Sequence, residues 1–192
     1  KLQKDEVSLS YKPQQVDLIP KQFSGTVRGL LEKIDKSQVE EIAKKLQLTR
    51  FLDTDIQKIS GGELQRTAIA AATLKEANIY LFDEPTSYLD IKQRIKISSY
   101  IASFADTGTS VMAIEHDLII LDYMADLVNI MYGHEGVFGV VSTVKSTREG
   151  LNAFLEGYLR EENVRFRQNA LKFERGQEKV QGIPQNLVSW TN

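Results

Sequence analysis

The clearest hydrophobic pattern in the chain is a short apolar run, residues 79–82, that ends in two adjacent carboxylates, Asp83 and Glu84. The run does not alternate apolar and polar residues, which predicts a strand covered on both faces, as in a parallel sheet packed by helices. Pro85 then ends the strand. In open α/β sheets, ligands bind beyond the carboxyl ends of the strands. The pattern therefore predicts an α/β fold with a mostly parallel sheet and a polar site at Asp83 and Glu84.

A second apolar strand, residues 111–114, is followed directly by Glu115 and His116. Because the carboxyl ends of parallel strands meet at one edge of a sheet, we expect His116 to lie next to Asp83 and Glu84. A lone histidine is more often a surface or core residue than a catalyst. Its position after this strand makes it a candidate for the same site.

Helical periodicity accounts for much of the remaining chain. Apolar residues recur every three or four positions between residues 25 and 52, and again over residues 91–104, where Asp90 is the expected cap. Residues 133–136 are expected to turn between two strands of a hairpin, with His134 solvated. Two pairs have the spacing of a capping box at a helix start, namely Ser37 with Glu40 and Ser146 with Glu149.

Ser60 precedes a further predicted helix and has Glu63 three residues later, which is the strongest capping-box signal in the chain. Gly61 and Gly62 would let a phosphate approach the backbone where the helix presents unpaired N–H groups and the positive end of its dipole. The pattern fits an anion site, and it also fits a helix that is simply well capped.

Composition limits the possible classes of function. The chain has 192 residues, enough for one domain with a substantial core, and its net charge of −2 indicates that any nucleic-acid contact comes from a local patch. It has no cysteine, which excludes disulfides and thiolate-ligated metal or iron–sulfur clusters within the chain. No apolar run approaches the roughly 20 residues that span a bilayer, and no signal peptide is evident. A cytoplasmic protein without membrane contact is expected.

Three motifs follow one another in a characteristic order. They resemble the signature motif, the Walker B motif with its D-loop, and the switch histidine of an ABC-type ATPase: SGGELQR at 60–66, FDEPTSYLD at 82–90 and EHD at 115–117. Further segments narrow the resemblance to the ribosome-recycling ABC ATPases, the RNase L inhibitor family of archaea and eukaryotes: YKPQ at 11–14, REG at 148–150 and RFR at 165–167. The resemblance covers roughly residues 9–167. Ordinary transporter ATPases share only the catalytic motifs.

This resemblance implies a catalytic set for ATP hydrolysis. Glu84 would polarise the attacking water, Asp83 would ligate Mg²⁺, and His116 would contact the γ-phosphate. Gln14 matches the Q-loop glutamine, which contacts the magnesium ion and the water in this family. The cofactors implied are ATP and Mg²⁺, and the family's iron–sulfur cluster would lie outside this chain.

The resemblance implies a second set that serves another domain. Ser60, Gly61, Gly62 and Glu63 would close on the nucleotide held by a partner nucleotide-binding domain, and Asp90 would contact that domain. Glu63 stands where glutamine is more usual in ABC proteins.

The Walker A pattern GxxxxGK[ST] does not occur in the sequence. We therefore expect a P-loop NTPase-like ABC domain that lacks its Walker A segment, with the P-loop N-terminal to Lys1 and no ATPase activity in this chain alone. The expected division is a partial nucleotide-binding domain over residues 1–158, with a helical subdomain near 25–75, and a hinge over 159–192. The implied partners are a second nucleotide-binding domain, the small ribosomal subunit with its rRNA, and a release-factor-like protein.

One locally basic segment lies near the C-terminus of this slightly acidic chain, with Phe166 between two of its arginines. It comprises Arg160, Arg165, Arg167, Lys172, Arg175 and Lys179. Arginine beside an aromatic residue can pair with phosphate and stack on an exposed base, so we predict that Arg165 and Arg167 contact rRNA. The alternative is a solvated hinge in which Phe166 packs on the domain and the arginines pair with Glu161, Glu162 or Glu174.

The leading interpretation is thus part of an ATPase that splits ribosomes into subunits. Two alternatives remain open at this point. One is the nucleotide-binding subunit of a membrane transporter. The other is an interaction module without a P-loop and without turnover of its own.

Overall fold

The computed structural model describes residues 7–105 and 108–171. Its contacts divide the chain into two compact units, which are described separately. The first runs to Asn129 and includes Val144–Leu151, and the second comprises Ile130–Thr143 and the chain from Asn152 onward. These units do not coincide with the expected boundary at residue 158, because the segment Ile130–Thr143 groups with the C-terminal part of the chain. Lys172, Arg175 and Lys179 lie outside the described residues.

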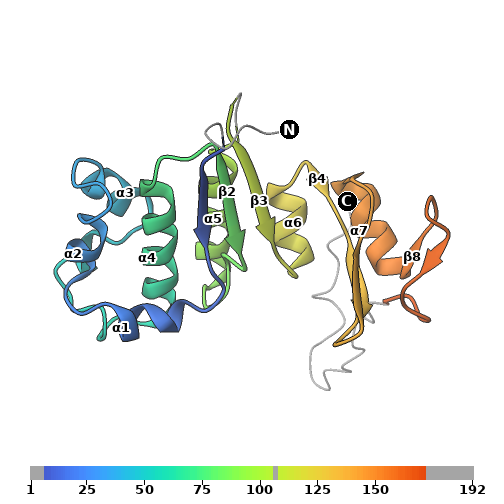
Figure 1. Cartoon of the computed structure of the whole chain (residues 1–192), viewed down its shortest axis with the longest axis horizontal. Coiled ribbons are helices and arrows are strands. Elements are labelled where there is room, and N and C mark those ends of the chain that lie inside the picture. The colour runs from blue at the N-terminus through green and yellow to red at the C-terminus, as the bar shows by residue number, and fades with distance from the viewer. Residues whose placement is uncertain (1–6, 106–107, 172–192) are drawn as a thin grey trace, which may run out of the picture. The chain divides into compact units, whose positions relative to one another are not determined.

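The first unit contains a three-stranded parallel sheet in the order β1-β2-β3, built from β1 (Leu9–Lys12), β2 (Ile79–Asp83) and β3 (Ser110–Ile114) (Figure 1). In this register Lys12 lies beside Phe82, and Asp83 lies beside Ile114. The carboxyl ends of all three strands therefore meet at one edge, as expected for a parallel sheet. The predicted α/β class is confirmed.

The two faces of the sheet are covered unequally. Tyr80 and Phe82 point into the main apolar core, where Phe82 is fully buried. On the opposite face Leu9 and Met112 are 48% and 62% exposed. The expectation of a strand covered on both faces is therefore wrong for the described residues. An apolar strand sequence indicates that both faces can be buried, but it does not specify which segment packs on each face.

The main core packs one face of the sheet against helices, with α4 (Gly61–Leu74) contacting both β1 and β2. Residues 25–75, where a helical subdomain is expected, contain α2 (Val27–Leu31), α3 (Val39–Lys45), η2 (Thr49–Phe51) and α4. Their apolar positions are buried at helical spacing, including Val27, Leu31, Val39 and Ile42. Burial of these stripes stabilises short helices that would be marginal alone.

The predicted side-chain caps form at Ser60 and Asp90 but not at Ser37. Ser60 and Glu63 form the complete capping box of α4, and Asp90 caps α5 (Ile91–Ala102) by accepting a hydrogen bond from Gln93 N, so both predictions are confirmed. The capping box predicted at Ser37 is wrong. The Ser37 hydroxyl instead donates to Asp35 Oδ1 at 2.7 Å, and α3 begins after Gln38 without a side-chain cap. A local aspartate competes successfully for the serine.

The remaining elements of the first unit are short. They are η1 (Val16–Leu18), α1 (Ile19–Gln22), α6 (Leu118–Met124), the antiparallel pair β4 (Leu127–Val128) and β7 (Lys145–Ser146), and the start of α7 (Thr147–Glu156). At α7 the backbone N–H of Glu149 donates to Ser146 Oγ, whose hydroxyl donates in turn to the Glu149 carboxylate. This is a variant of the predicted capping box.

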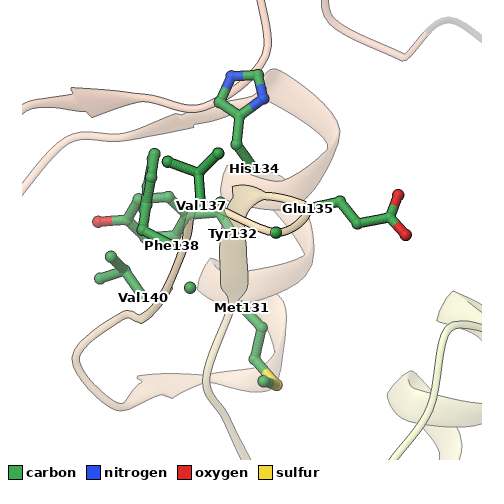
Figure 2. Close-up of a pocket in the computed structure, with 10 residues that line it drawn as sticks. Met131, Tyr132, His134, Glu135, Val137, Phe138 and Val140 are labelled. Atoms are coloured by element: carbon green, nitrogen blue, oxygen red, sulfur yellow. The ribbon is translucent and has the colours of Figure 1, made fainter.

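The second unit contains two hairpins, β5 (Met131–His134) with β6 (Phe138–Val141), and β8 (Tyr158–Leu159) with β9 (Val164–Arg165). The first confirms the predicted hairpin. It borders an open pocket lined by its own residues, from Met131 to Val140, and the exposed His134 is one of these lining residues (Figure 2). None of the predicted site residues lines this pocket.

Within the described residues, none of the helices combines the length and the apolar character needed to cross a membrane.

Candidate active site

The acidic pair lies at the carboxyl edge of the sheet, as predicted. Asp83, the last residue of β2, accepts a hydrogen bond on Oδ2 from the Tyr11 hydroxyl of β1, at 3.1 Å. Desolvation of the phenol, together with this hydrogen bond and the aspartate charge, raises the pKa of Tyr11. Tyr11 therefore remains a neutral donor that orients the Asp83 carboxylate.

Glu84 has an unusual main chain. Its φ of +45° lies in the left-handed region, which residues other than glycine seldom occupy. Its N–H donates to the carbonyl of Ile114, at the end of β3, at 2.9 Å, and the Ser87 hydroxyl donates to its Oε2 at 3.1 Å. Hydrogen bonds thus fix both the backbone and the carboxylate of Glu84.

His116 lies beside Glu84, as predicted from the common carboxyl edge of the parallel strands. Its Nδ1 is 3.8 Å from Glu84 Oε1, and its side chain is 77% exposed. The preceding residue, Glu115, accepts hydrogen bonds from both the N–H and the hydroxyl of Thr86, at 2.9 and 2.7 Å. The following residue, Asp117, caps α6 and pairs with Arg94 at 2.8 Å. The loop that carries His116 is therefore held on both sides while the imidazole stays open.

Lys12 lies beneath the acidic pair and is completely buried. Its ammonium donates to the main-chain carbonyl of Asp83 at 2.7 Å and to that of Glu84 at 3.2 Å. Burial lowers the pKa of Lys12 to about 8, and the charges of Asp83, Glu115 and Glu84 oppose that change. The negative charge around the site therefore helps to retain a cation where solvation is poor.

Gln14 lies just beyond the carboxyl end of β1, in the loop that leads to η1, and its side chain is exposed. Its carbonyl accepts a hydrogen bond from Val16 N at 3.0 Å. The side chain takes no part in the hydrogen bonds that hold Asp83 and Glu84. Gln14 thus lies at the same edge of the sheet as the acidic pair, and its side-chain amide makes no hydrogen bond to that pair.

The signature residues lie at the start of α4, next to the D-loop. A Cβ on Gly62 would lie 3.1 Å from the carbonyl oxygen of Tyr88, and one on Gly61 would contact the Tyr88 ring. The close approach of the D-loop backbone therefore favours glycine at position 62. The phosphate access predicted from sequence would favour glycine there as well. Ser60 and the N-cap Asp90 are both exposed at this surface.

The residues present fit a magnesium ion bound together with phosphate oxygens. Mg²⁺ prefers oxygen ligands and usually takes only one or two carboxylates, the remaining positions being filled by water and phosphate. Asp83 has a carboxylate at the open edge of the sheet, and Gln14 would offer an amide oxygen, which is also a ligand type that Mg²⁺ accepts.

The two arginines predicted to contact RNA have different environments. Arg167 is half-buried, and its guanidinium donates to the carbonyls of Phe154, Leu155 and Asn169. Arg165 is exposed and lies over the ring of Tyr158, with the guanidinium carbon 5.1 Å from the ring centroid. Phe166 stacks on Tyr132 with a centroid separation of 5.7 Å. Phe166 and Arg167 therefore pack within their own unit, and Arg165 is the exposed arginine of the RFR segment.

Sequence reasoning missed several residues that shape the site, namely Tyr11, Lys12, Gln65, Thr86 and Glu115. Their contacts cross between elements far apart in the sequence, so finding them requires the register of β1 on β2 and the packing of α4 on both. The one available signal was the presence of Lys12 in an otherwise strand-like segment, where an unpaired charge would be costly.

Comparison with known proteins agrees with this geometry. The family model described as ABC transporter matches residues 1–87. An uncharacterized ABC transporter ATP-binding protein, MJ0719 of Methanocaldococcus jannaschii, is 47% identical over 91% of this chain and 29% of its own length. The translation initiation factor RLI1 of Saccharomyces cerevisiae is 45% identical over 90% of this chain and 29% of its own length.

Solved structures extend the agreement to three dimensions. A crystal structure of the archaeal ribosome recycling factor aABCE1 with the ribosomal stalk protein aP1 matches 94% of this chain with a TM-score of 0.85 and 50% identity, over 35% of that chain. A model of ribosome-bound archaeal Pelota and ABCE1 matches 91% of this chain with a TM-score of 0.86 and 49% identity, over 30% of that chain.

This chain belongs to the RNase L inhibitor family of ABC ATPases. The alignments with family members cover about nine-tenths of the chain, well beyond the general ABC match that ends at residue 87. The chain spans about 29% of the length of these curated relatives. In the RNase L inhibitor family it therefore corresponds to a segment with ABC ATPase architecture, and ATP is the nucleotide that this architecture implies.

Proposed function

We propose that this chain is the part of a ribosome-recycling ATPase that supplies the catalytic carboxylates and switch histidine of one nucleotide site and the signature motif of the opposite site. The observation that carries this proposal is the convergence of Asp83, Glu84 and His116 at the ends of the adjacent strands β2 and β3. Such an edge can present an acid pair and an imidazole to one ligand without burying an unpaired charge.

Each residue of the catalytic set has a distinct role in this proposal. Asp83, oriented by Tyr11, would hold Mg²⁺ together with Gln14, and the ion when bound would neutralise phosphate charge. Glu84 is placed one residue further from the strand and accepts a proton from, or orients, the attacking water. His116, exposed beside Glu84, donates to the γ-phosphate and registers its loss.

The signature set serves a nucleotide held by a second nucleotide-binding domain. Ser60 and Glu63 cap the first turn of α4, which places Gly61 and Gly62 where an α-helix has N–H groups that it cannot pair internally. Asp90 and the exposed Tyr88 lie at the same surface and would contact that domain. We infer that this chain alone does not turn over ATP, since it carries no Walker A sequence.

The proposed ribosome-recycling function also implies the partners. Closure of two such domains on ATP would drive the splitting of ribosomes in the cytoplasm. The complex of aABCE1 with a ribosomal stalk protein and the ribosome-bound complex of ABCE1 with Pelota support contacts with the ribosome and with a release-factor-like protein. We propose that the ribosomal contact includes the small subunit and its rRNA. The transporter alternative is less well supported, because the relatives that match nine-tenths of the chain at the highest identities include ribosome recycling and translation factors.

The decisive experiment replaces the matching segment of the archaeal recycling factor with this chain. Glu84→Gln in that protein should abolish ATP turnover while ATP stays bound, because binding needs the phosphate contacts and hydrolysis needs the carboxylate. Asp122→Asn, an exposed carboxylate on α6 of the same unit, is the control for loss of one charge. Near-normal hydrolysis in the Glu84 variant would remove Glu84 from this role.

Fractionation of the same protein separates the alternatives. Copurification with the small ribosomal subunit supports the recycling function, and copurification with membranes would support a transporter subunit. If the chimeric protein binds neither ribosomes nor ATP, the chain is an interaction module.

A further inference from the structure

We propose that Lys12 and Gln65 are positioning residues for ATP hydrolysis, which together fix the main chain of Glu84 so that its carboxylate faces the attacking water. This inference rests on the proposed role of Glu84.

The geometry centres on one carbonyl oxygen. The main-chain oxygen of Glu84 accepts a hydrogen bond from Gln65 Nε2 at 2.7 Å and another from Lys12 Nζ at 3.2 Å. A carbonyl oxygen has two lone pairs, so both donors can be accommodated. They come from different elements, because Lys12 ends β1 and Gln65 lies in the first turns of α4. The ammonium of Lys12 also holds the carbonyl of Asp83, so one side chain binds the backbone of both carboxylate residues.

Glu84 needs such support because of its backbone conformation. A residue with a Cβ persists at a φ of +45° only where the surrounding structure determines it. Rotation of φ to the common negative range would redirect the Glu84 side chain relative to the end of β2. The two donors, together with the bond from Glu84 N–H to the Ile114 carbonyl, oppose that rotation.

Burial argues that these two polar side chains are present for this contact rather than for packing. Both Lys12 and Gln65 are fully buried, where an apolar residue of similar length would fill the space without a desolvation cost. Gln65 Oε1 has no hydrogen-bond partner among the described residues, so the bond from Nε2 to Glu84 is what orients this amide. A buried amide with half of its capacity unused is costly unless the other half has a role.

The test uses Lys12→Met and Gln65→Leu in the full-length chimeric recycling factor. Each substitution removes the donor and leaves an apolar side chain that is shorter by one heavy atom. Because displacement of a reacting group by about 1 Å can cost on the order of 100-fold, we expect kcat to fall by roughly 10- to 100-fold while KM for ATP changes less than about threefold. A second readout, independent of turnover, is amide hydrogen exchange without nucleotide: the N–H groups of Glu84, Thr86 and Ser87 should exchange faster.

Two controls lose a buried hydrogen bond elsewhere in the same elements. The Ser10 hydroxyl, on the same buried face of β1 as Lys12, donates to the Ala72 carbonyl at 2.6 Å, and the Thr73 hydroxyl donates within α4 at 3.0 Å. Ser10→Ala and Thr73→Val should lower the melting temperature without the change in kcat and without faster exchange at Glu84.

The outcomes separate this inference from the proposed function. If Glu84→Gln is inactive but Lys12→Met and Gln65→Leu keep the kcat and exchange rates of the controls, the two residues are ordinary core residues and the inference is wrong. If Glu84→Gln itself turns over ATP normally, the proposed function fails first. Should Lys12→Met not fold, Gln65→Leu carries the test alone, since it removes the amide donor without introducing another.

Discussion

At the scale of single residues, His116 provides a sharp test, because its side chain is highly exposed and its Nδ1 lies 3.8 Å from Glu84 Oε1. If it contacts the γ-phosphate, His116→Ala should slow hydrolysis on the order of 100- to 1,000-fold, the usual cost of removing one preorganised donor. The steady-state ATPase rate of the full-length protein measures this. His134→Ala, at the other, exposed histidine of the chain, should leave the rate unchanged. A loss of less than a few-fold at His116 would identify it as a solvated surface residue.

Residues at this scale also show what a sequence can and cannot reveal. Asp83, Glu84 and His116 were predictable because a strand boundary is a local signal, and parallel strands end at a common edge. Lys12 and Gln65 were not, because their contacts with Glu84 depend on how β1 and α4 pack against β2. The left-handed backbone of Glu84 had no sequence signal either, since glutamate gives no hint of a positive φ.

At the scale of elements, two serines with the same apparent capping signal behave differently. Ser60 caps α4 with both bonds of the capping box, whereas Ser37 is bound to Asp35 in the preceding turn. Ser60→Ala should therefore lower the free energy of unfolding by about 1 kcal/mol, and Ser37→Ala by less than about 0.5 kcal/mol. Chemical denaturation of the two variants measures the difference. Equal losses would show that the box at α4 does not contribute to stability. The apolar periodicity predicted the helices themselves, but only the competing acceptor, Asp35, determined which serine became a cap.

At the scale of the whole molecule, binding to the ribosome should depend on Arg165 more than on Arg167. Arg165 is exposed, whereas the guanidinium of Arg167 is used by three main-chain carbonyls of its own unit. Arg165→Glu should weaken binding of the full-length protein to the small subunit and flatten its salt dependence, because fewer counterions are released. Binding titrations at several salt concentrations measure both quantities, with the exposed Arg148→Glu as a control of equal charge change. Unchanged affinity and slope would leave the segment as a structural hinge.

The positive φ of Glu84 has a consequence for how selection acts on this position. At most sites alanine is more favourable than glycine, because glycine loses more backbone freedom on folding. At residue 84 the order should invert: in thermal melts Glu84→Gly should be more stable than Glu84→Ala by about 1 kcal/mol, since only glycine adopts this conformation without steric conflict. A glutamate held there keeps the protein below the stability that this fold could reach, and that deficit is an expected mark of a position retained for chemistry.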